Sequence, residues 1–276
     1  MNFKRIQWIF VIAFAIFDIV LASYFLIGTH FTAMVKQQSQ QQLILKEMHN
    51  DEISFAELST KQPMGYYISA NRANSQLTNN AAAKLDDQTV RLSNGTLISE
   101  LDVPFKVSVL NPERQLNDYI KNSRHVLYGS HYVYNKALSS SSTIVYTQMM
   151  EGRPVLGSEG QLRFKIGRNH KVYAYTQTYL NNIQVLRPRS VTISQQEAVT
   201  WLYKHNYIPN NSKIRWAKLG YTKTLLTKDQ TVYVPTWYVE IKTKNSDDVQ
   251  RLRVNAFNST LMRNTPEEID TTQLNQ

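Results

Sequence analysis

Residues 194–206 read "SQQEAVTWLYKHN", and this stretch carries the clearest helix signal in the chain. Ser194 and Glu197 form a capping box, in which each side chain accepts a hydrogen bond from the backbone N–H of the other residue. The stripe expected to face inward follows at helical spacing and consists of Ala198, Trp201, Leu202 and His205. His205 is then a residue of the helix end rather than a ligand.

The same order of elements occurs twice along the chain. After the helix at 194–206, strand-like runs follow at residues 213–226, 231–243 and 249–262. Earlier, residues 111–126 predict a helix with Asn111 as its cap and Pro112 at its first position. Its strand-like runs are residues 131–137, 142–150, 160–166 and 171–180, with a tight hairpin turn at 167–170. Before residue 88 only the run at 65–69 is a clear strand, and residues 71–87 predict a loop around a short helix. Two related units, each a helix packed on an antiparallel sheet, indicate an α+β fold.

The N-terminal stretch "RIQWIFVIAFAIFDIVLASYFLIG", residues 5–28, is apolar apart from one acid. As a helix, Ile6 to Ile27 covers about 33 Å, which matches a hydrocarbon core of about 30 Å. Lys4 and Arg5 precede the span, so the N-terminus is expected in the cytoplasm. A cleaved signal peptide is the main alternative, but the apolar region is too long for one and no clean cleavage site follows. We therefore expect a single-pass protein of the cell membrane with an extracellular domain.

These signals divide the chain into six segments. They are a cytoplasmic N-terminus (1–5), a transmembrane helix (6–28), a helical neck (29–53), a first α+β ectodomain unit (54–188), a second α+β unit (189–265) and a flexible tail (266–276). The neck is rich in glutamine and lacks proline and glycine between residues 36 and 52, which favours a helix.

Composition excludes several kinds of chemistry. The chain has no cysteine, which rules out thiol catalysis and thiolate metal sites and is typical of a bacterial rather than an animal cell surface. The formal net charge of +10 favours anionic wall polymers or lipid headgroups, although a generally basic, solvated surface is the simpler interpretation. A nucleic-acid partner is not expected outside the membrane. Hydrolase, Walker and dinucleotide motifs are missing from the sequence, and its histidines are scattered. We predict no catalytic residues, no metal and no cofactor.

Three segments of the C-terminal part resemble PepSY-type domains. They are "TISQQEAVTWLYKH" (192–205), "YVPTWYVEI" (233–241) and "RLRVNAFNSTLM" (251–262). Val234, Pro235 and Trp237 match the V-P-x-W segment of those domains. The last turn departs from the D-A-x-x-G-like pattern, with Asn255, Ala256, Phe257 and Asn258 where an acid and a glycine are usual.

The whole chain resembles the YycI (WalI) family. The resemblance is carried by the short basic start, the anchor "WIFVIAFAIFDIVL" (8–21), the glutamine-rich neck and "GRPVLGSEGQLRFKI" (152–166). Members of that family are membrane-anchored accessory regulators of the WalK/WalR (YycG/YycF) two-component system in low-GC Gram-positive bacteria. The resemblance implies a non-catalytic regulator whose partners are a WalK-like sensor histidine kinase and a YycH-like single-span protein. Only about five residues precede the span, so any signal must pass through the span or the ectodomain.

Asp18 lies near the middle of the predicted span. An Asp at the centre of a membrane helix costs about 2.5 to 3.5 kcal/mol, whereas the Leu, Ile, Phe and Val side chains between Ile6 and Ile27 contribute about −4 to −8 kcal/mol together. The segment can therefore insert, but the acid is then protonated or meets a partner. The expected partner-helix contact is the stripe of Gln7, Ala15, Asp18 and Ala22, where small residues let another backbone approach.

The 16 tyrosines and four tryptophans allow a function of another class. Aromatic residues on strands usually serve core packing, but Tyr and Trp are also enriched at interfaces. The possible ectodomain interface consists of Tyr66, Tyr67, Trp216 and Trp237. On this alternative the ectodomain is a binding module for a wall-derived ligand or an anionic wall polymer.

Overall fold

The computed structural model describes residues 3–72, 77, 79–226, 230–244, 246 and 249–262. The tail predicted at 266–276 lies outside the described residues. The chain divides into two compact units, Met1–Ile53 and Ser54–Gln276, and each is described by itself.

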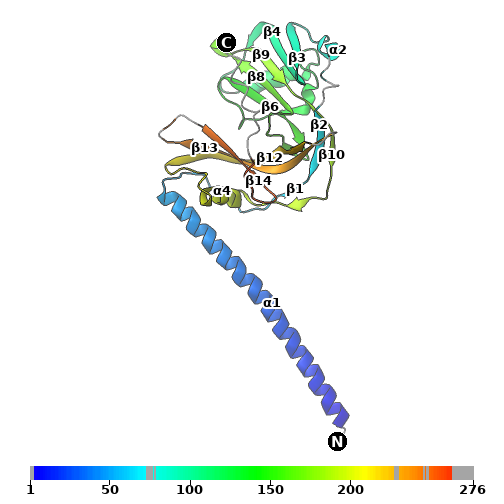
Figure 1. Cartoon of the computed structure of the whole chain (residues 1–276), viewed down its shortest axis with the longest axis vertical. Coiled ribbons are helices and arrows are strands. Elements are labelled where there is room, and N and C mark those ends of the chain that lie inside the picture. The colour runs from blue at the N-terminus through cyan, green and yellow to red at the C-terminus, as the bar shows by residue number, and fades with distance from the viewer. Residues whose placement is uncertain are drawn as a thin grey trace. The chain divides into compact units, whose positions relative to one another are not determined.

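The first unit is one long helix, α1, which spans Phe3–Asn50 (Figure 1). Its 48 residues extend over roughly 72 Å. The helix ends in a Schellman motif, in which Ile53 N donates to Met48 O over 2.9 Å and Glu52 N donates to His49 O over 3.1 Å, with Glu52 at φ 58°. The Met48 and Ile53 side chains are buried. In the described part of the chain, no helix is both long enough and apolar enough to be assigned as a membrane span.

The second unit contains a seven-stranded antiparallel sheet with the strand order β3-β4-β9-β8-β6-β5, and β7 also pairs with β6 (Figure 1). The strands are β3 (Gln88–Ser93), β4 (Thr96–Lys106), β5 (Tyr132–Tyr134), β6 (Thr143–Met150), β7 (Arg153–Pro154), β8 (Gln161–Ile166) and β9 (Lys171–Gln177). Two helices, α2 (Asn79–Ala82) and α3 (Pro112–Lys121), and two 3₁₀ turns, η1 (Gly129–His131) and η2 (Arg168–His170), belong to the same part of the chain.

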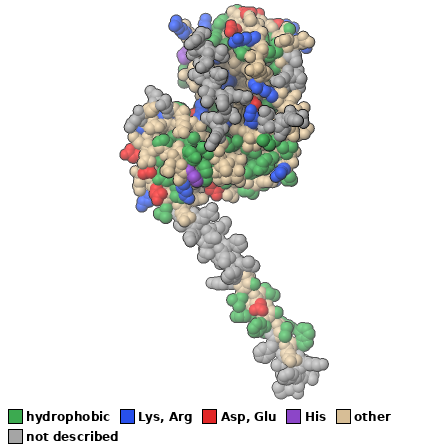
Figure 2. Space-filling view, viewed as in Figure 1, with side chains coloured by type: hydrophobic (Ala, Val, Ile, Leu, Met, Phe, Trp, Pro, Cys, Tyr) green, Lys and Arg blue, Asp and Glu red, His purple; other side chains and the backbone are tan. Residues whose placement is uncertain are grey.

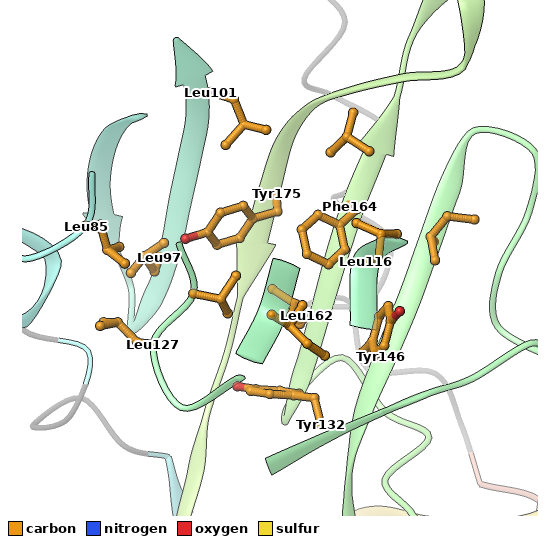
Figure 3. Packing of buried hydrophobic residues seen from close by; sticks show 14 of the residues in the cluster. Leu85, Leu97, Leu101, Leu116, Leu127, Tyr132, Tyr146, Leu162, Phe164 and Tyr175 are labelled. Atoms are coloured by element: carbon orange, nitrogen blue, oxygen red, sulfur yellow. The ribbon is translucent and has the colours of Figure 1, made fainter. Parts of the chain in front are cut away.

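The core of this sheet is rich in tyrosine and leucine (Figure 3). Alternate residues of β8, Leu162 and Phe164, point to the same face of the sheet and are fully buried, as the period of a strand requires. Leu116 of α3 packs against this face together with Tyr146 and Tyr175. Burial of each such side chain contributes about 1.5 to 3 kcal/mol, so this core is the main reason that α3 stays on the sheet.

The second sheet has five strands, in the order β10-β2-β13-β12, with β14 also paired to β13. The strands are β2 (Ile68–Arg72), β10 (Leu180–Val185), β12 (Ser212–Leu226), β13 (Thr231–Thr243) and β14 (Val249–Asn255). Helix α4 (Gln195–Lys204) contacts β12 and β13, and a separate two-stranded sheet joins β1 (Met64–Gly65) to β11 (Ser190–Val191). Pro235 lies between the residues of β13 that pair with β2 and the residues of β13 that pair with β14. Proline has no backbone N–H, and at this position neither of these two strands requires one.

The α+β prediction is confirmed: the fold is dominated by sheets and has few helices. The capping box is also confirmed, because Ser194 Oγ accepts from Glu197 N over 3.1 Å and Glu197 Oε2 accepts from Ser194 N over 2.7 Å. Of the predicted inward stripe, Ala198 and Leu202 are buried, while His205 is exposed and stacks on Trp201 at 4.1 Å.

The structure differs from the expectations from the sequence in four places. Asn111 precedes α3 but its side chain makes no capping hydrogen bond. The run at 65–69 is divided between β1 and β2. The hairpin of β3 and β4 was missed, although Asn94 and Gly95 form its turn with positive φ, which is a strong hairpin signal. In addition, β2 and β10 come from the segment predicted as the first unit, yet they pair within the sheet of β12, β13 and β14.

Candidate functional site

The stripe predicted to contact a partner helix lies on one uninterrupted helix. At 100° per residue, Gln7, Ala15, Asp18 and Ala22 fall within a sector of about 80° around α1. All four side chains are exposed. Figure 2 shows one acidic position among hydrophobic side chains on the part of α1 towards the N-terminus. The stripe therefore presents one carboxyl and one amide group, flanked by small residues.

The structure does not bring the four aromatic residues of the possible ectodomain interface together. The half-buried ring of Tyr66 packs against the core cluster around Tyr221. The backbone N–H of Tyr66 donates to Tyr221 Oη over 3.2 Å. Tyr67 is stacked on Phe257 at 4.6 Å. Trp216 packs against another cluster, which contains Leu138, Val145, Leu156 and Tyr238.

Trp237 is the member of that set that lines a cavity. It lies on β13 and is 7% exposed, and its indole Nε1 donates to Ile193 O over 2.9 Å. The cavity, of about 610 Å³, is lined by residues of β5, β6 and β7 on one side and of β12, β13 and α4 on the other. We call it the inter-sheet cleft, because its walls come from both large sheets.

The walls of the inter-sheet cleft are fixed by hydrogen bonds. Gln195, at the start of α4, accepts from Ser59 N over 2.9 Å and donates to Ala217 O of β12 over 2.8 Å. On the opposite side, Arg153 Nη2 donates to Met64 O over 3.0 Å. Because these side chains already have partners, the cleft is preformed.

The charge of the inter-sheet cleft is positive. Lys136, Arg153 and Lys218 line it, and none of the described lining residues is acidic. Val133 and Met149 add exposed apolar surface on the same lining. A cleft with this combination suits an acidic segment of a partner that also carries apolar side chains.

A second exposed surface is apolar and is formed by the outer strand β10 of the five-stranded sheet, the residue after it, and the two-stranded sheet of β1 and β11. It comprises Met64, Ile183, Val185, Leu186 and Val191. Figure 2 shows hydrophobic side chains gathered over the region where Figure 1 places β1 and β10. An outer strand with exposed apolar side chains and few charges is a typical contact surface for another protein.

Two buried acids are held by ion pairs and hydrogen bonds. Glu240 lies between Arg215 and Arg251, each 2.8 Å from one of its oxygens. Glu159 accepts a hydrogen bond from Tyr233 Oη and pairs with Lys223 at 3.4 Å. Burial, followed by the neighbouring Glu159, raises the pKa of Tyr233 above its ordinary value, so Tyr233 stays protonated and donates.

Sequence reasoning identified Trp237 but missed the cations of the inter-sheet cleft. Lys136, Arg153 and Lys218 are far apart in the chain and belong to three different elements or loops. Only the pairing of the strands brings them to one cavity, so no local spacing could have indicated them. The V-P-x-W pattern, which contains Trp237, and the start of the predicted helix at Gln195 were the signals within reach of the cleft.

Comparison with known proteins gives one family match. The family described as YycI protein matches residues 33–257. No match was found among curated proteins.

Solved structures of low sequence identity are also similar to this chain. An uncharacterized protein from Eubacterium rectale has a TM-score of 0.43 at 9% identity, covering 77% of this chain and 89% of that one. The Bacillus megaterium YpeB C-terminal domain has a TM-score of 0.37 at 11% identity, covering 82% of this chain and 95% of that one.

Proposed function

This chain belongs to the YycI family, which implies a role in regulating the WalK/WalR two-component system, and we propose that it acts there as a non-catalytic membrane protein. In this proposal it changes the output of a WalK-like sensor histidine kinase by direct contact. It does so together with a YycH-like single-span companion. The family match is the single observation that carries the proposal.

The proposed topology places residues 6–28 across the membrane, the N-terminus in the cytoplasm and residues 54–276 outside a Gram-positive cell. It rests on the sequence, in which Asp18 is the only charged residue between Ile6 and Ile27. The chain offers a clean test because it contains no cysteine. Single cysteines at Asn2 and Arg168 are treated in intact cells with a membrane-impermeant maleimide. The topology requires labelling at position 168 alone, and labelling at position 2 contradicts it.

In the proposed contact with a partner, Asp18 hydrogen-bonds across to another membrane helix. An interhelical hydrogen bond in a membrane contributes about 0.6 to 2 kcal/mol, which corresponds to about a 3- to 30-fold change in association. Asp18→Leu should therefore weaken co-purification with the kinase or the companion by this factor without reducing expression. Ile16→Leu, on the opposite side of α1, is the matched control and should have no effect.

The ectodomain contributes a second proposed contact through the inter-sheet cleft. Its lysines and apolar rim favour an acidic segment of the companion or of the kinase ectodomain. Charge reversal in the cleft tests this contact separately from the membrane stripe.

A function of another class, the binding of an anionic wall component, is favoured by a different observation. A second cavity of the ectodomain combines lysine, arginine and serine side chains with an exposed tyrosine ring. That cavity lies on other elements than the inter-sheet cleft and can be tested alone.

A further inference from the structure

The second cavity has a volume of about 750 Å³ and lies where the C-terminus of α3 meets the loop that follows α2. We call it the basic pocket. The lining cations Lys84 and Arg124 are accompanied by Ser123, Tyr128 and Ser130, and one acid, Asp86, also lines the pocket. None of them belongs to the contacts proposed above. Behind the pocket, Leu85 and Leu127 lie at one end of the core cluster (Figure 3).

The loop that forms one wall of the basic pocket is held in place by side chains of the seven-stranded sheet. Gln88 Nε2 donates to His125 O over 3.1 Å, and Tyr175 Oη donates to the same carbonyl over 2.8 Å. Gln177 Nε2 donates to Leu127 O. A loop without regular structure whose carbonyls are satisfied in this way is rigid, so the pocket is preformed rather than induced.

Tyr128 has a backbone conformation that bulky residues rarely adopt. Its φ of 52° and ψ of 30° lie in the left-handed region, which costs an aromatic residue about 1 to 2 kcal/mol. The ring stacks on Tyr179 at 4.8 Å with an interplanar angle of 21°, and Tyr128 stays 39% exposed at the pocket. Strain of this kind at a cavity is typical of a binding site.

The neighbouring glycine holds the strained turn in position. A Cβ atom on Gly129 would lie 1.7 Å from Ile120 O, so the turn is pressed against the backbone of α3. The Tyr128 ring is therefore a fixed platform with one face on Tyr179 and surface left for a ligand.

The polar groups of the basic pocket are available to an anion. Within the described part of the chain, Lys84 makes no ion pair and the Ser123 and Ser130 hydroxyls make no hydrogen bond. Arg124 pairs with Asp86 at 3.2 Å, but both side chains are largely exposed, and such pairs contribute little to stability. A planar guanidinium with five N–H donors can keep this contact and still bind a ligand oxygen.

We propose that the basic pocket binds an anionic saccharide, that is, a sugar ring carrying a phosphate or carboxylate group. The apolar face of the ring lies on Tyr128, the anion meets Lys84 and Arg124, and the ring hydroxyls bond to Ser123 and Ser130. An aromatic platform beside cations selects this class over a plain anion, because each part of the pocket then has a partner on the ligand. The assignment rests on the second function proposed above and is independent of the membrane contacts.

Calorimetric titration of the full chain in detergent with N-acetylglucosamine 6-phosphate tests the assignment. N-acetylglucosamine and inorganic phosphate serve as probes of the ring and of the anion alone. We expect the sugar phosphate to bind at least about tenfold more tightly than either, and its affinity to fall as salt rises. Equal binding of inorganic phosphate, or no heat with the sugar phosphate at about 10 mM, overturns the assignment.

Two variants test separately the contribution of the Tyr128 ring and that of the positive charge to ligand binding. Tyr128→Asn removes the ring but keeps a residue that tolerates the left-handed conformation, so the turn is retained. Lys84→Ala removes the unpaired ammonium. Each should weaken the binding of the sugar phosphate about tenfold, whereas Lys106→Ala on β4, outside both cavities, is the matched control and should leave it unchanged. Unchanged affinity in both pocket variants contradicts the assignment. Co-purification with the kinase reports on the regulatory function separately, because no pocket residue belongs to that contact.

Discussion

The turn beside the basic pocket makes a quantitative prediction about Gly129. Replacing it by alanine places a Cβ atom 1.7 Å from Ile120 O, where real Cβ atoms keep at least 3.0 Å, so the turn or α3 must move by about 1.3 Å. The obstructing atom belongs to the helix backbone and cannot rotate away. Overpacking of a tight site costs about 1 to 3 kcal/mol, and a rigid obstacle places Gly129→Ala near the top of that range.

Gly152 serves as a control that distinguishes the cost of a steric clash from the cost of backbone strain. Gly152 has φ 74° but nothing within 4 Å of its added Cβ, so Gly152→Ala meets strain without a clash. The left-handed conformation costs about 1 to 2 kcal/mol, and the loss of unfolded-state freedom offsets about 0.4 to 1 of that. We therefore expect a loss of about 2 to 3 kcal/mol for Gly129→Ala and about 0 to 1.6 kcal/mol for Gly152→Ala.

Urea denaturation of the full chain in detergent, followed by circular dichroism, measures both losses. For a unit the size of Ser54–Gln276, about 2 to 3 kcal/mol corresponds to a decrease of about 4 to 12 °C in melting temperature. A loss below about 0.5 kcal/mol for Gly129→Ala, or one no larger than that of Gly152→Ala, would refute the placement of this turn against α3.

Two further predictions concern α4 and the inter-sheet cleft. Glu197 is partly buried, which alone would raise its pKa, but hydrogen bonds from Ser194 and Gln62 outweigh this and hold the pKa below its ordinary value. Its contribution to stability is therefore complete above about pH 4.5, the ordinary range of a glutamate, and is lost as the pH falls through the lower pKa of the folded state. Unfolding measured across this range should show a steeper loss for the wild type than for Glu197→Gln, and parallel curves would contradict the capping box. The double variant Lys136→Glu and Lys218→Glu should reduce co-purification of the companion severalfold at low salt, whereas Lys106→Glu on β4 should not; equal capture by both variants would exclude the cleft as the contact.

Local signals in the sequence were sufficient for α4. A capping box, a helical stripe and a polar end all lie within residues 194–206, and each acts over one or two turns. The same holds for the turn at Asn94 and Gly95, which was missed although its signal is equally local. Where a feature depends on neighbours along the chain, the sequence can predict it.

Non-local features were beyond the sequence. Val232 of β13 pairs with Ser69 of β2, and no periodicity at either residue indicates this. The cations of the inter-sheet cleft and the placement of Tyr128 over the basic pocket depend on such pairings and on packing against α3. The four aromatic residues were grouped by residue type alone, and the fold distributes them among different clusters.

In the function proposed above, this chain regulates a kinase through contact by α1. Its most direct test is the autophosphorylation rate of a WalK-like kinase in proteoliposomes, measured without this protein, with the wild type, with Asp18→Leu and with Ile16→Leu. We expect that the wild type and Ile16→Leu change the rate equally and that Asp18→Leu removes most of this change. An equal effect of all three proteins would contradict the claim, and so would a wild type that leaves the kinase rate unchanged.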